Sequence, residues 1–120
     1  MANDFQTHAV QVNSSNISTF VPDGTTSINT SAQVVIHAVY VTNQSSTNDT
    51  TFDLILSDGA NTIISYILKD IELPRSSTIS VEKPINLPQS TTPTVTRKLR
   101  IKADSQNIHA TASVLVITVW

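Results

Sequence analysis

The sequence predicts an all-β fold, an antiparallel β-sandwich of about eight strands with a jelly-roll-like arrangement. Three observations support this class. The β-branched residues Val, Ile and Thr are abundant and favour strands. No segment has the periodicity of an amphipathic helix. Turn signals separate the apolar runs at short spacings. Because the 120 residues show no internal boundary, we expect a single domain over residues 1–120.

The first third of the chain predicts three strands. Short strands are expected near residues 7–12 and 17–21, and the polar residues 1–8 suggest a short, flexible N-terminal arm. Residues 33–43 are apolar at both even and odd positions, which predicts a central strand covered on each face. His37 lies among the valines of this run, and we expect it in the core.

The middle of the chain predicts a β-hairpin across residues 51–69. Residues 50–57 alternate between apolar and polar side chains, so one face of this strand should lie on the core. The dipeptide Asp58-Gly59 then tolerates the positive φ of a tight turn. A second β-branched run, residues 62–69, follows at once.

Three more strands are expected at residues 78–87, 97–103 and 108–119. In 97–103 the side chains alternate between an apolar and a cationic face. The final run is apolar at both parities up to the C-terminus, and we expect both of its faces to be buried. Trp120 would either plug the end of the sandwich or anchor the chain in another subunit.

Composition excludes several partners. Seven basic against nine acidic residues give a net charge of −2, which is unsuited to neutralising nucleic-acid phosphates. No stretch approaches the roughly 20 apolar residues of a membrane span. The N-terminus lacks the features of a signal peptide, so we expect synthesis in the cytoplasm without secretion by a signal. Charged residues are 13% of the chain. A surface with few charges is easily desolvated, which favours a surface that another protein covers. A neutral soluble domain whose surface stays exposed to solvent has the same composition.

No catalytic or metal motif is present, and we expect neither an enzyme nor a cofactor. There is no cysteine, no G-x-S-x-G elbow and no glycine-rich phosphate loop. His8, His37 and His109 are far apart, so a zinc site or a His/Asp enzyme site would require folding to assemble it. Most carboxylates fall at predicted turns, where a side chain that bonds the local backbone is a sufficient explanation.

Four segments, in this order, carry a resemblance to a known class of proteins: residues 20–26 (FVPDGTT), a strand ending in Val-Thr-Asn43, residues 53–59 (DLILSDG) and the corner Leu73-Pro-Arg-Ser-Ser77. The pattern resembles small structural proteins of tailed bacteriophages. The glycine usual after a second Leu-Pro corner is missing at residues 87–90 (LPQS).

The resemblance implies a virion subunit that binds the major capsid protein or other virion subunits. We expect a capsid decoration (cement) protein on the outer head surface, acting as a homo-oligomer, a trimer. A tail, neck or fibre and baseplate module, with or without a host-glycan surface, is the alternative.

The interface residues expected from the sequence are apolar groups in a polar arm, a terminal aromatic residue and the cationic face of residues 97–103. That cationic face would meet an acidic partner or would be a solvated face that protects a sheet edge. The residues are Phe5, Val10, Lys98, Arg100, Lys102 and Trp120.

Overall fold

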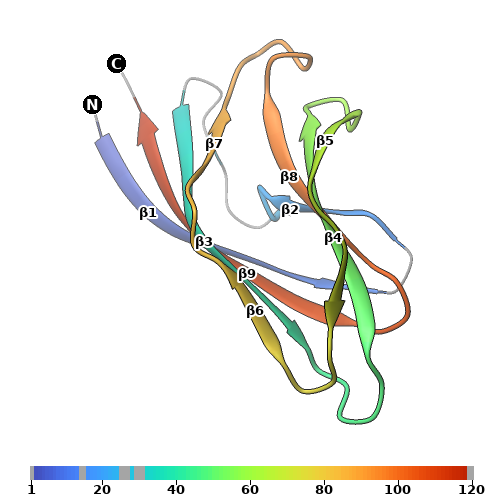
Figure 1. Cartoon of the computed structure of the whole chain (residues 1–120). Coiled ribbons are helices and arrows are strands. Elements are labelled where there is room, and N and C mark those ends of the chain that lie inside the picture. The colour runs from blue at the N-terminus through green and yellow to red at the C-terminus, as the bar shows by residue number, and fades with distance from the viewer. Residues whose placement is uncertain (1, 14–15, 25–27, 29–31, 119–120) are drawn as a thin grey trace.

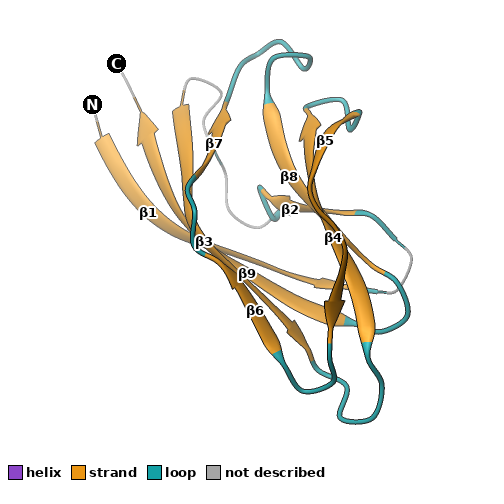
Figure 2. Cartoon of the chain, in the orientation of Figure 1, coloured by secondary structure: helices purple, strands orange, loops and turns teal. Residues whose placement is uncertain are grey.

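The computed structural model describes residues 2–13, 16–24, 28 and 32–118, which form a sandwich of two antiparallel β-sheets (Figure 1). The described residues contain strands and no helix (Figure 2), so none of them forms a helix that could cross a membrane. The predicted all-β sandwich is confirmed. The strands are β1 (Ala2–Val12), β2 (Ser18–Val21), β3 (Ala32–Asn43), β4 (Thr50–Asp58), β5 (Ile63–Leu73), β6 (Thr78–Val81), β7 (Ile85–Pro88), β8 (Arg97–Ala103) and β9 (Ile108–Thr118).

The strand order is that of a jelly roll. One sheet has five strands in the order β1-β9-β3-β6, with β7 also paired to β3, and the other has four strands in the order β2-β8-β4-β5. The chain crosses between the sheets at most connections, so neighbouring strands are distant in sequence, as in two interlocked Greek keys. The jelly-roll-like arrangement is therefore also confirmed.

The polar N-terminal segment belongs to the first strand. β1 pairs with β9 in unbroken register from Ala2 to Val12. The prediction of an arm at residues 1–8 is therefore wrong for residues 2–8. The cause is the length of β9, which continues to Thr118 and offers ladder partners to the backbone of residues 2–8, whatever their side chains.

A β-bulge in β3 explains why its sequence is misleading. The register of β3 against β9 shifts between Ile36 and Ala38. Ile36 is buried before the bulge, and Val39 and Val41 are buried after it, although their parity in sequence differs. Apolar residues at even and odd positions therefore lie on the same covered face of β3. The prediction that both faces of this strand are covered is wrong. His37 is exposed at the bulge and does not lie in the core.

β4 and β5 form the predicted antiparallel hairpin. The Asp58 carboxylate closes its turn by accepting hydrogen bonds at 2.9 Å from the backbone N–H groups two and four residues further on. The positive φ falls on Asn61, at 68°, and not on Gly59. Gly59 is required for space, because a Cβ there would lie 2.9 Å from the carbonyl oxygen of Pro93.

The strand expected at residues 78–87 is divided into β6 and β7, which pair with different parts of β3. Residues 82–84 interrupt it, and the proline at position 84 has no N–H to donate to a ladder. This division accounts for a ninth strand where about eight are predicted.

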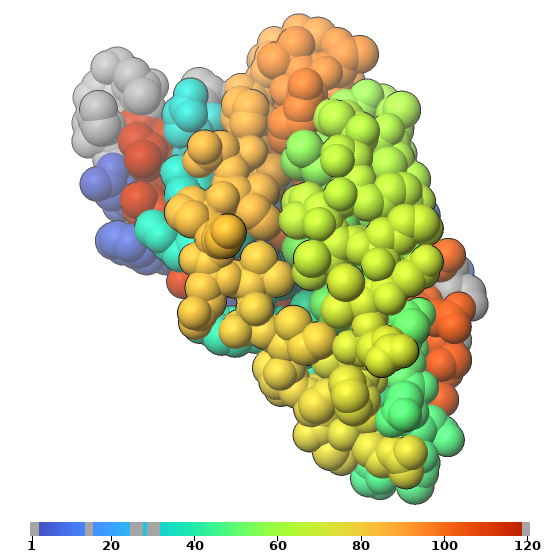
Figure 3. Space-filling model, viewed as in Figure 1, coloured from blue at the N-terminus to red at the C-terminus, as the bar shows by residue number. Residues whose placement is uncertain are grey.

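The core lies between the inward faces of the two sheets. In the space-filling view the side chains of β5 (yellow-green) and of β6 and β7 (gold) close the side turned to the viewer (Figure 3). In β9 only alternate residues point inward, and Leu115 and Ile117 on its other face are half-buried, so the prediction that both faces of this strand are buried is wrong. The largest fully buried side chains are Phe20, Phe52, Ile36, Leu54, Ile55, Leu73, Leu87, Leu99, Ile101, Ile108, His8 and Val12.

Candidate functional site

Two of the four segments singled out in the sequence form one end of the fold. Asn43, at the end of the Val-Thr-Asn motif, is fully buried. Its amide nitrogen donates to the carbonyl oxygens of Asn48, at 2.9 Å, and Leu73, at 3.1 Å, and its oxygen accepts from the Ser45 N–H at 3.0 Å. Leu73 begins the Leu-Pro corner. The two motifs are thus hydrogen-bonded to each other and position loops rather than a docking surface.

The FVPDGTT motif is joined to β1. The backbone N–H of Asp23 donates to Nδ1 of His8 at 3.1 Å, and its carboxylate accepts from the Ala9 N–H at 3.1 Å. Since His8 Nδ1 accepts, its proton lies on Nε2, which donates to the Gln6 side-chain oxygen at 2.8 Å. Burial lowers the pKa of His8, and the nearby Asp23 carboxylate opposes this shift. His8 and Asp23 do form a His/Asp pair, but both ring nitrogens of His8 already take part in hydrogen bonds within the fold.

The expected interface residues do not form one surface. Phe5 is 76% exposed on the outward side of β1, whereas Val10, of opposite parity, points inward and packs against the core. The three cationic residues lie on β8, in the other sheet. Trp120 lies outside the described residues. The apolar character of Val10 therefore reflects core packing, which the sequence could not distinguish from docking.

The cationic row on β8 is half-buried. Lys98 donates to the Asn61 side-chain oxygen at 3.3 Å, and Arg100 donates to the Ile17 carbonyl oxygen at 3.3 Å. Arg100 also stands opposite Ile55, which is fully buried on the outward side of the four-stranded sheet. Arg100 therefore covers apolar surface. β8 is an inner strand, but β2 pairs only with residues 99–101, so Lys98 and Lys102 lie beyond the part of β8 that β2 covers.

The outward surface of the five-stranded sheet, here called the outer face, is uncharged over its described strand residues. Register places paired residues on the same side, and none of those on this side is Asp, Glu, Lys or Arg. The outer face consists of Asn3, Phe5, Thr7, Ala9 and Gln11 on β1, Gln33, Val35, Ala38, Tyr40 and Thr42 on β3, Thr78 and Ser80 on β6, Asn86 and Pro88 on β7, and His109, Thr111, Ser113, Leu115 and Ile117 on β9.

Apolar groups gather at one end of the outer face. Phe5 on β1 is paired with Leu115 on β9, and Leu115 is paired in turn with Val35 on β3. Tyr40, further along β3, is 42% exposed between Thr111 and Ser80. Interface cores are depleted of charge and enriched in aromatic side chains. The outer face therefore has the chemistry of a protein-docking surface.

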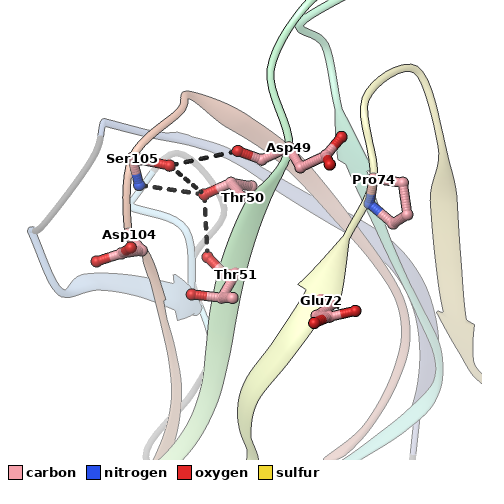
Figure 4. Close-up of a pocket in the computed structure, with 7 residues that line it drawn as sticks. All are labelled: Asp49, Thr50, Thr51, Glu72, Pro74, Asp104 and Ser105. Atoms are coloured by element: carbon pink, nitrogen blue, oxygen red, sulfur yellow. Dashed lines mark hydrogen bonds between the residues drawn. The ribbon is translucent and has the colours of Figure 1, made fainter.

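A polar hollow lies at the loop end of the sandwich, among Asp49, Thr50, Thr51, Glu72, Pro74, Asp104 and Ser105 (Figure 4). Hydrogen bonds join Asp49, Thr50 and Ser105 to one another within its lining. The backbone N–H of Ser105 donates to the Thr50 hydroxyl at 3.1 Å. Asp49 accepts from the backbone and side chain of Arg75, and these hydrogen bonds lower the pKa of Asp49. The hollow has no aromatic residue in its lining on which a sugar ring could stack.

The three histidines lie apart, with His8 buried in β1, His37 exposed at the bulge and His109 half-buried on β9. Among the described residues, no group of three or more His, Asp or Glu side chains could hold a metal ion. Asp53 lies within β4, in the strand expected at residues 50–57, and its carboxylate accepts from the Asp70 N–H at 2.8 Å.

Comparisons with known proteins leave the family open. No protein-family model and no curated protein matches the sequence. Among solved structures there is a likeness to the N-terminal endo-1,4-beta-D-xylanase 10B of Clostridium thermocellum, in a structure of its CBM22-1 and GH10 modules complexed with xylohexaose. It covers 98% of this chain and 26% of that chain, with 19% identity and a TM-score of 0.38. The chain thus spans about a quarter of that protein, and so weak a likeness carries no functional argument.

Sequence reasoning missed most of the outer face. Tyr40, in an apolar run, is 42% exposed on this face. In β9 the residues from Val114 to Ile117 are apolar at both parities, so the sequence did not show which of them point outward. In β3 the bulge concealed which residues share a face.

Proposed function

We propose that this chain is a structural subunit of a tailed-phage virion that binds other protein subunits through the outer face. A capsid decoration protein on the outer head surface is the form we favour, with the major capsid protein as partner. The observation that carries the proposal is the absence of Asp, Glu, Lys and Arg over the described outer face, together with the exposed Phe5. The order of the four phage-like motifs supports the virion context.

Docking through such a face is favourable because little charge is desolvated. Hydroxyl groups such as those of Thr111 and Ser113 can form new hydrogen bonds across a contact, whereas a buried unpaired charge cannot. Binding only to the assembled shell would stabilise that shell by mass action, by about 2.7 kcal/mol per site at a hundredfold excess over Kd.

Immunogold labelling of phage particles, viewed by electron microscopy, tests the location. Gold distributed over the head supports a decoration protein. Gold confined to one end of the particle supports the alternative of a tail, neck or fibre module. Particles without gold would overturn the virion proposal in both forms.

Binding of the purified protein to heads that lack it tests the surface. Thr111→Glu places a carboxylate at the exposed centre of the outer face, and Thr91→Glu makes the same change in an exposed loop. We expect Thr111→Glu to weaken head binding by tenfold or more, about 1.4 kcal/mol or above. Thr91→Glu should bind like the parent chain. Equal binding by both variants would remove the outer face from the proposal.

One observation favours a glycan-binding tail or fibre module. Tyr40 is 42% exposed on the outer face, where its ring could stack on a sugar. A glycan array in which the parent chain binds a sugar and Tyr40→Ala does not would support this alternative. An array without a hit would count against it.

A further inference from the structure

Three of the four sheet edges carry features that hinder pairing with another strand. β2 has only four residues and a register shift. β5 has three register shifts against β4. β6 and β7 have four residues each, with a proline between them. β1, in contrast, has 11 residues in unbroken register with β9 and contains no Pro, Lys or Arg. Natural sheets blunt their edges with such devices. Between Asn3 and Thr7 the edge of β1 carries one charged residue, the exposed Asp4, and none of the other devices, so it is suited to pairing.

The outer edge of β1 presents backbone donors and acceptors. The Ala9 N–H donates to the Asp23 carboxylate and therefore points away from β9. In an antiparallel ladder, every second residue directs its N–H and C=O to the same side. Asn3, Phe5 and Thr7 therefore direct theirs to this edge, and no described residue bonds their backbone there.

We propose that β1 pairs antiparallel with β1 of a second copy of this chain, about a twofold axis at Phe5. In this register Phe5 lies opposite the same residue of the second copy, and Asn3 lies opposite Thr7. Asp4 lies opposite Gln6, and within one chain the Gln6 amide already donates to the Asp4 carboxylate at 2.8 Å. The segment is thus self-complementary, with an aromatic ring opposite an aromatic ring and an amide opposite a carboxylate.

The symmetry of this contact decides the number of copies. An edge that pairs with itself antiparallel is isologous and closes as a dimer. The contact therefore produces a dimer in place of the trimer expected from the resemblance. It also joins two outer faces into one continuous uncharged sheet surface. The inference does not depend on the virion proposal, because the edge is the same wherever the protein is located.

Sedimentation velocity over a concentration series tests the contact. We expect the parent chain to reach the mass of two chains. Phe5→Lys places like charges opposite each other on the axis, and Thr7→Pro removes an N–H that points away from β9. Both should lower the dimer affinity at least tenfold. Val95→Lys, at another exposed apolar residue, is the matched control and should remain dimeric. Circular dichroism and thermal unfolding establish that each variant is folded.

Spin labels measure the register. The chain has no cysteine, so Ala9→Cys and Gln11→Cys each give one label per chain on the exposed side of β1. With the axis at Phe5, the paired positions lie 8 and 12 residues apart along the ladder, about 27 and 41 Å at roughly 3.4 Å per residue. Distances in this order support the proposal. A parent chain that stays monomeric or forms a trimer, folded Phe5→Lys and Thr7→Pro variants that still dimerise, or label distances that do not increase from Ala9 to Gln11 would overturn it.

Discussion

Protonation of His8 should destabilise the folded protein. His8 is fully buried, accepts a hydrogen bond from the Asp23 N–H at Nδ1 and donates from Nε2 to Gln6. A protonated ring cannot accept at Nδ1, so the Asp23 N–H would lose its partner. The carboxylates near this chain of hydrogen bonds are Asp23, 3.6 Å from Nδ1, and Asp4, reached through Gln6. Burial has the larger effect and lowers the pKa of His8 below its ordinary value of 6.5.

The sign and size of the effect follow from proton linkage. Because the folded-state pKa is lowered, the unfolded chain binds more protons below pH 6.5, and stability decreases as the pH falls. One such group changes the free energy of unfolding by at most about 1.4 kcal/mol per pH unit. This loss begins near pH 6.5 and ends at the lower folded-state pKa. Above pH 6.5 the contribution of His8 is fully present.

Denaturant unfolding at a series of pH values between about 5 and 8 measures this slope. The comparison is between the parent chain, His8→Gln, which cannot titrate, and His37→Gln, which changes an exposed histidine. We expect the slope to diminish in His8→Gln and to remain in His37→Gln. If the parent chain and His8→Gln lose stability equally as the pH falls, the linkage to His8 is wrong.

Three further predictions concern stability, each read from denaturant unfolding. Leu54→Ala should cost about 2–5 kcal/mol because Leu54 is fully buried, whereas Ile64→Ala, at a residue 46% exposed, should stay within about 0.5 kcal/mol of the parent chain. Gly59→Ala should cost about 1–3 kcal/mol, since the new Cβ meets the Pro93 carbonyl oxygen at 2.9 Å, and an unchanged midpoint would show that the 93–96 loop moves aside. Asn43→Leu should cost about 1–3 kcal/mol or more by leaving buried backbone groups without a partner, and a smaller loss would show that water replaces the amide.

Local pattern was sufficient to predict the strands that follow a strict period. Residues 97–103 alternate without a bulge, and β8 occupies these same positions. The hairpin of β4 and β5 was predictable because Asp58 and Gly59 form a recognisable turn signal between two β-branched runs. The absence of helical periodicity sufficed for the all-β class.

The sequence could not reveal what depends on pairing partners. The bulge near His37 inverts the parity of β3, and its position is set by the register against β9, a strand about 80 residues further along the chain. Residues 2–8 are polar, yet they belong to β1 because β9 is long enough to pair with them. Neither the bulge in β3 nor the pairing of residues 2–8 with β9 can be recognised from the neighbouring residues in the sequence.

By itself, the sequence determined the fold class, the approximate number of strands and the low charge of the whole chain, since these follow from composition and short-range periodicity. Only the tertiary structure decided where the charges lie. The jelly-roll order places the alternating cationic residues of β8 in one sheet and the uncharged sides of β1, β3 and β9 in the other. The outer face and the exposed edge of β1 exist because long-range strand pairing brings together segments that are distant in the chain.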